Sequence, residues 1–152
     1  MAINEFAEVI RAQFSGLLVH RGFVIAEELY HPEHMGWAST CLESPHTGIL
    51  AVCERGVVSF SVGPMAAPQR EWYALPIILA ALHPETPVPP VPSAPTGWDY
   101  RAILEAQVRH WGRLLDQYGE PLLAGDWSKK RQIAATQRKI VAQARQLLTV
   151  KP

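Results

Sequence analysis

The 152-residue sequence predicts a single α+β domain, residues 1–152, in which helices cover one face of an antiparallel sheet. Apolar residues recur at helical spacing near the N-terminus, alternate with a shorter period over residues 23–62, and return to helical spacing after residue 72. The links between the predicted strands are of hairpin length, too short for a parallel crossover. The composition, 48% hydrophobic and 18% charged, is that of a globular chain.

The first predicted element is an amphipathic helix over residues 5–21. Asn4 is suited to cap its start, and Gly22 follows as a stop signal. One helical stripe holds its apolar side chains, namely Phe6, Val9, Ile10, Phe14, Leu17 and Leu18. This stripe predicts a helix packed on the core.

Four short strands follow, separated by clusters of turn residues. They are predicted over residues 23–30, 37–43, 49–54 and 57–62. The connection between the second and third strands is expected at Ser44-Pro45-His46-Thr47-Gly48. If its loop is His46-Thr47-Gly48, with Gly48 in the left-handed conformation, then residues 41 and 53 pair across the strands. The expected sheet is an antiparallel meander of four strands.

Three helices are predicted after the sheet, over residues 72–82, 99–118 and 128–148. Prolines crowd residues 84–95, which predicts an extended strap on the surface of the same domain. No internal repeat is expected. The three helices are the expected cover for the apolar face of the sheet.

The location expected for the protein is the cytoplasm. No apolar run reaches the roughly 18 residues of a membrane span, so no membrane contact is expected. The N-terminal residues lack the basic and apolar regions of a signal peptide. Only two cysteines occur, without a C-x-x-C spacing, as in proteins of a reducing compartment.

Charge is distributed unevenly along the chain. Residues 1–128 hold 7 basic and 14 acidic residues, a balance of −7, whereas residues 129–152 hold 7 basic residues and no acid. A basic terminal helix can bind nucleic acid, pair with a second copy, or dock on its own acidic body. The basic residues lack the dense, aromatic-interleaved cluster of nucleic-acid arms, so the expectation is an intramolecular dock with at most a weak homodimer contact.

His31 and His34 are the candidate metal ligands, with Glu33 between them and Glu27 and Glu28 just upstream. Because the pair spans a proline turn and no third ligand is fixed by the spacing, an exposed turn without metal is expected. Cys41 and Cys53 are expected as cross-strand neighbours on one face of the sheet, reduced and buried.

Catalytic motifs are missing from the sequence. It contains no G-x-S-x-G, no H-E-x-x-H and no glycine-rich phosphate loop. No catalytic residue and no cofactor is therefore predicted.

Several segments resemble a group of small uncharacterised bacterial proteins. They are Glu54-Arg55-Gly56 with the strand to Pro64, Glu71-Trp72-Tyr73-Ala74-Leu75, the helix from Leu104 to Gly119, and Leu122 to Trp127. That group is similar to the immunity partners of polymorphic bacterial toxins, which neutralise a toxin by binding it. The resemblance implies an immunity-type inhibitor that binds a protein toxin domain, and it implies no catalytic residues.

Two functions therefore remain open. The first is a binding protein, for which the acidic body suits a basic nuclease as partner. The alternative is a small enzyme or ligand-binding domain with a pocket between the sheet and the helices.

Overall fold

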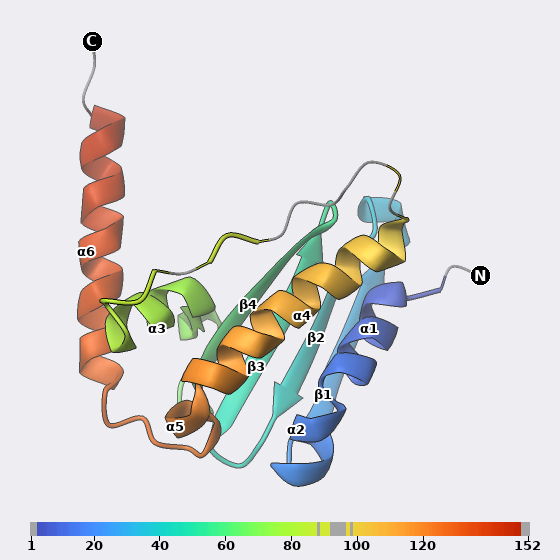
Figure 1. Cartoon of the computed structure of the whole chain (residues 1–152), viewed down its shortest axis with the longest axis horizontal. Helices are drawn as coiled ribbons and strands as arrows, with labels where there is room; N and C mark the ends of the chain where they lie inside the picture. The colour runs from blue at the N-terminus through green and yellow to red at the C-terminus, as the bar shows by residue number, and fades with distance from the viewer. Residues whose placement is uncertain (1–2, 88, 92–96, 98, 150–152) are drawn as a thin grey trace.

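The computed structural model describes residues 3–87, 89–91, 97 and 99–149 (Figure 1). Its centre is one sheet in the strand order β1-β2-β3-β4-β5, in which all neighbours are antiparallel. The strands are β1 Val24–His31, β2 Trp37–Glu43, β3 Thr47–Glu54, β4 Val57–Pro64 and β5 Tyr73–Ala74. The predicted antiparallel α+β architecture is confirmed, and a short fifth strand is added to the predicted four.

Six α-helices surround this sheet in the described part of the chain. They are α1 Glu5–Gln13, α2 Ser15–His20, α3 Leu75–Leu82, α4 Tyr100–Tyr118, α5 Glu120–Leu123 and α6 Lys130–Thr149. Helices α1 and α4 lie side by side on one face of the sheet, as Figure 1 shows. Helix α6 packs against α3 instead of covering the sheet, which corrects the expectation that all three later helices form the cover.

The predicted N-terminal helix is broken at Phe14. Asn4 caps α1 as expected, its side-chain oxygen accepting from the Ala7 N–H at 3.0 Å. Phe14 then leaves the helical conformation, with φ −104° and ψ 17°, and its buried ring packs against Phe60 at 5.4 Å. The apolar stripe therefore continues across two helices, α1 and α2, that join at Phe14.

The turn between β2 and β3 lies earlier than expected. Ser44 N–H donates to the Thr47 carbonyl at 2.9 Å, and Thr47 N–H donates to Ser44 Oγ at 3.1 Å. These bonds close the turn over residues 44–47, so Gly48 lies inside β3, opposite Glu43. The connection predicted over residues 44–48 contains this turn. The loop at 46–48 with a left-handed Gly48 is wrong, because the Ser44 side chain closes the turn earlier in the chain.

Trp72 precedes the third helix instead of starting it. The next two residues, Tyr73 and Ala74, pair with β4. The helix begins at Leu75 with Pro76 in its first turn, where a backbone N–H has no partner within the helix and proline is tolerated. The Trp72 ring lies on the sheet face away from α4, over Gly48 and Gly63. Those glycines leave the space that the ring occupies.

One continuous core joins the sheet to α1, α3, α4 and α5. Gln107 of α4 ties the helix to the β3–β4 hairpin: its Oε1 accepts from Val58 N–H at 3.0 Å and its Nε2 donates to the Gly56 carbonyl at 2.7 Å. Trp111 Nε1 donates to the Val58 carbonyl at 3.2 Å. Helix α4 is thus held on the sheet by hydrogen bonds as well as by apolar contact.

The proline-rich strap is described only in part. Residues 84–87 and 89–91 leave the end of α3 and are mostly exposed, as expected for a surface segment. The rest of the predicted strap, residue 88 and residues 92–95, lies outside the described residues. None of the described helices is long and apolar enough to cross a membrane.

Strand β1 forms one edge of the sheet. It pairs with β2 along its length, and the register shifts between Ile25 and Glu27, which is a β-bulge at Ala26. Glu28 of this strand forms an ion pair with Arg11 of α1. The strand is thereby tied to the covering helix layer.

Candidate functional site

His31, Glu33 and His34 lie on an exposed turn after β1. His31 Nδ1 is 3.2 Å and His34 Nε2 is 3.9 Å from Glu33 Oε1. Glu28 does not join them, since it pairs with Arg11. Among the described residues no group of three or more His, Cys, Asp or Glu side chains could hold a metal ion. That the histidines bind no metal stays a prediction.

Cys41 and Cys53 are buried free thiols on opposite faces of the sheet. Cys41 faces Leu50 across β2 and β3, whereas Cys53 faces Ala38. The earlier turn moves the register by three residues from the expected one, and an odd shift sends a side chain to the other face. The prediction of cross-strand neighbours is therefore wrong.

The surroundings of the two thiols differ. Burial, with Glu43 as a further cause, raises the pKa of Cys41 to about 11, so its reactive thiolate is scarce at neutral pH. Cys53 lies on the core face, where its Sγ is 3.6 Å from the Tyr100 hydroxyl. Burial and this contact raise the pKa of Tyr100. Neither thiol has the environment of a nucleophile.

The base of α6 is anchored to the body. Ile133 is completely buried, and Gln132 Nε2 donates to the Ala81 carbonyl in the last turn of α3 at 2.6 Å. Just before the helix, Trp127 Nε1 donates to Thr47 Oγ1 at 3.0 Å, and that hydroxyl donates to the Leu122 carbonyl at 2.5 Å. The start of α6 is therefore fixed in position.

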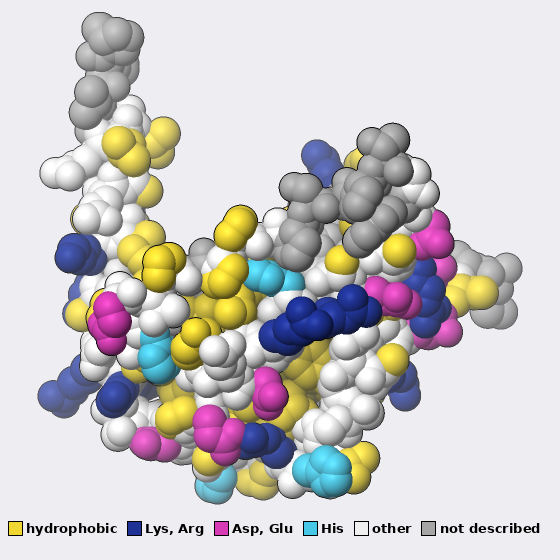
Figure 2. Space-filling model, in the orientation of Figure 1, with side chains coloured by type: hydrophobic (Ala, Val, Ile, Leu, Met, Phe, Trp, Pro, Cys, Tyr) yellow, Lys and Arg dark blue, Asp and Glu magenta, His cyan; other side chains and the backbone are white. Residues whose placement is uncertain are grey.

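The second half of α6 extends away from the body (Figure 1). The exposed fractions of its large apolar residues are 38% at Ile140, 43% at Val141, 78% at Leu147 and 81% at Leu148. Figure 2 shows hydrophobic side chains along this projecting part. The predicted intramolecular dock is thus correct for Ile133 and wrong for Ile140, Val141, Leu147 and Leu148.

A seven-residue repeat runs along α6, which corrects the expectation of a chain without internal repeats. Residues 131–137, 138–144 and 145–151 read RQIAATQ, RKIVAQA and RQLLTVK. Each repeat begins with Arg and places a large aliphatic residue third, at Ile133, Ile140 and Leu147. Such a period keeps one apolar seam turned toward a neighbouring helix. The first repeat meets α3, while the large apolar residues described in the next two, Ile140, Val141, Leu147 and Leu148, are exposed.

A row of arginines follows the same period. Arg131, Arg138 and Arg145 are seven residues apart and lie beside the apolar seam, and residues 129–152 contain no acid. The candidate functional site is therefore the projecting half of α6, residues 138–148, an apolar seam bordered by guanidinium groups.

Comparison of the chain with models of protein families, with curated proteins and with solved structures finds no match.

Proposed function

We propose that this is a binding protein that engages a protein partner through the projecting half of α6, and that it acts as an immunity-type inhibitor of a toxin domain. The observation that carries the proposal is the apolar seam that continues beyond the body at Ile140, Val141, Leu147 and Leu148. Full burial of a large aliphatic side chain is worth roughly 1.5–3 kcal/mol. Covering this seam would supply much of the free energy of a specific complex.

The proposed partner surface is an apolar groove, or the face of a helix, bordered by carboxylates. Arg138 and Arg145 suit carboxylates because a guanidinium group binds them in a bidentate way. A second copy of α6 would bring an equal positive charge to the same seam, and like charges oppose that pairing. We therefore assign the seam to a different protein and not to a homodimer.

The immunity-type role rests on the resemblance in residues 54–64 and 71–75 and on the fixed base of α6. A helix held rigidly at Ile133 and Gln132 presents its seam without a large loss of conformational freedom on binding. The acidic body, net −7 over residues 1–128, would steer a partner that also carries a basic surface.

The proposal is tested with the protein encoded beside this one, produced together with it in a bacterial host. We expect the neighbouring protein to arrest growth and the wild-type chain to relieve the arrest. The double variant L147E/L148E should fail to relieve it, because two charges would enter the buried seam. Val19→Glu, at an exposed apolar residue of α2, is the matched control and should protect like the wild type.

Two results would contradict the proposal at different points. Full protection by L147E/L148E would remove α6 as the contact. A neighbouring protein that neither arrests growth nor binds the wild-type chain in calorimetry would remove the immunity role. Sedimentation of the chain alone addresses self-association: a dimer that L147E/L148E dissociates would reassign the seam to a second copy.

A further inference from the structure

A groove lies between the α1–α2 pair and α4, on the side of the molecule away from α6 (Figure 1). Its volume is about 530 Å³, within the range of small-molecule sites, roughly 300–1,000 Å³. Apolar side chains from three helices and the Phe14 junction form its floor, in which Leu17 is partly exposed and the other four are buried, namely Phe14, Val108, Leu115 and Leu123. This floor would receive the apolar part of a ligand.

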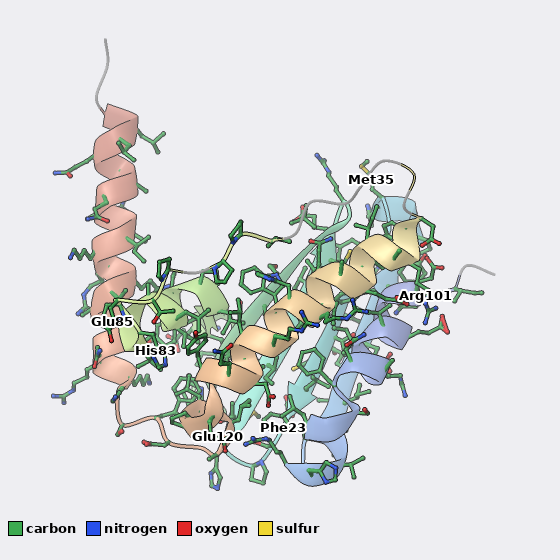
Figure 3. All side chains as sticks on the ribbon, in the orientation of Figure 1. Phe23, Met35, His83, Glu85, Arg101 and Glu120 are labelled. Atoms are coloured by element: carbon green, nitrogen blue, oxygen red, sulfur yellow. The ribbon has the colours of Figure 1, made fainter. Side chains whose placement is uncertain are left out.

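Ion pairs hold the two walls together at both ends of the groove. Arg101, in the first turn of α4, has its Nη1 3.3 Å from Glu8 Oε1 of α1. At the other end Arg21, just after α2, pairs with Glu120, with Nη1 donating to Oε1 at 2.8 Å. Figure 3 labels Arg101 and Glu120 at the two ends of α4. The two ion pairs therefore hold the α1–α2 wall and the α4 wall together at both ends of the groove.

Two helical glycines keep the middle of the groove open. A Cβ atom at Gly16 of α2 would meet nothing within 4 Å, and one at Gly112 of α4 would meet Phe14 Cζ at an ordinary 3.6 Å. A methyl group would therefore fit at both positions, and close packing does not require glycine at either of them. Glycine inside a helix costs roughly 0.5–1 kcal/mol relative to alanine. Both glycines line the groove, and their effect is to leave room in it.

The rim of the groove carries an excess of positive charge. Arg109 and Arg113 stand one turn apart on α4, and within the described residues neither has a carboxylate within 4 Å. Lys and Arg side chains gather over the middle of α4 in Figure 2. Asp116 is the acidic residue among the lining side chains, and Arg21 is already paired with Glu120. Two guanidinium groups thus remain to bind an anion.

From this combination we infer that the groove binds a small amphipathic organic anion, whose apolar body lies on the Phe14–Leu115 floor and whose anionic head pairs with Arg109 and Arg113. A guanidinium pair recognises a carboxylate or a phosphate in the same bidentate manner. The site is independent of the α6 seam, so its failure would leave the proposed function untouched.

The test uses decanoate, decyl phosphate, decanol and acetate, each titrated into the full chain. Calorimetry measures affinity, and NMR follows the amide signals of Gly16 and Gly112, with Gly63 as a distant reference. We expect decanoate or decyl phosphate to bind at least about tenfold more tightly than decanol and acetate and to shift the first two signals. The tighter of the two anions identifies the head group.

Three variants locate the site. R109Q/R113Q should weaken binding at least about tenfold, whereas Arg70→Gln, an exposed residue outside the groove lining, should not change it. Gly16→Leu should fill the groove and abolish binding without loss of stability, because its Cβ enters open space. The inference is overturned if neither anion binds, if decanol binds as tightly as both, or if Gly16→Leu and R109Q/R113Q bind like the wild type.

Discussion

The six-membered ring of Trp72 lies so close over Gly48 that a Cβ atom at Gly48 would be 2.0 Å from Trp72 Cη2. Gly63 on the neighbouring strand is equally close to the five-membered ring, at 2.0 Å from Cδ1. Trp72 Nε1 donates to the Ala67 carbonyl at 3.1 Å, which fixes the indole in this position. The ring therefore acts as a cover for one end of the sheet face that α1 and α4 leave open.

Gly48→Ala should destabilise the protein by about 1–3 kcal/mol or more, since the new methyl group overpacks the site under Trp72. Gly16→Ala is the matched control: its methyl group meets nothing, and a gain of up to about 1 kcal/mol is expected. Urea unfolding of both variants gives the comparison. Equal stability of the two would mean that the Trp72 ring does not lie on β3.

Gln107→Leu should cost about 1–3 kcal/mol, because it leaves the Val58 N–H buried without an acceptor. Gln117→Leu on the same helix, at an exposed position, should change stability by less than about 0.5 kcal/mol. Chemical denaturation at neutral pH measures both. A Gln107→Leu variant as stable as Gln117→Leu would refute the bridge to the hairpin.

Ile133→Ala should destabilise the fold by about 2–5 kcal/mol, whereas Leu147→Ala should change stability by less than about 0.5 kcal/mol. Ending the chain at Lys139 should leave the melting temperature nearly unchanged, and ending it at Asp126 should lower it strongly. Thermal unfolding followed by circular dichroism distinguishes these cases. A large loss on removal of residues 140–152 would show that the projecting half of α6 supports the body.

Both cysteines should titrate as free thiols once the protein is unfolded without reductant. In the native state Cys41 should be alkylated slowly below about pH 10 and faster above it, because its pKa is raised to about 11. Mass spectrometry of alkylated peptides separates the two sites. Rapid alkylation of Cys41 at neutral pH would contradict its burial.

Stability should fall as pH drops below about 6.5. Burial, with Arg113 as a lesser cause, lowers the pKa of His110 in the folded state from 6.5, so the unfolded chain binds a proton more readily. His110 therefore favours folding above pH 6.5 and opposes it below. His110→Gln should reduce the difference in unfolding free energy between pH 7 and pH 5. An unchanged difference would assign the acid sensitivity to other groups.

Local patterns in the sequence were sufficient for the elements that they define directly. The strand predicted over residues 37–43 and the helix predicted over 99–118 match β2 and α4 closely. Apolar residues recur at helical spacing along α4, and turn residues or caps mark the ends of both elements. Asp99, for example, caps α4 by accepting from the Ala102 N–H at 2.7 Å. No distant contact was needed to place them.

The errors arose where a distant residue decides the local structure. Gly48 is a typical turn residue, yet it lies in β3, where the ring of Trp72 takes the space of a side chain. The wrong prediction that Cys41 and Cys53 are neighbours follows from the same error, because it depends on the register between β2 and β3. Gly16 and Gly112 lie 96 positions apart, so the groove they open cannot be read from either segment. The α6 repeat, in contrast, is a local pattern that the sequence alone carries, because its period of seven involves no distant residue.

The bulge at Ala26 has a consequence for the behaviour of the protein at high concentration. An edge strand offers a row of unpaired N–H and C=O groups to which the edge of another molecule can bind, and such contacts grow into fibrils. In β1 the bulge bends this row, and Glu27 and Glu28 place negative charge beside it. At the opposite edge β5 pairs with Ser61 and Val62 of β4, and farther along β4 the Val58 N–H and carbonyl are bound by Gln107 and Trp111 of α4. Both edges are thus poor templates for strand addition, which protects the sheet against aggregation.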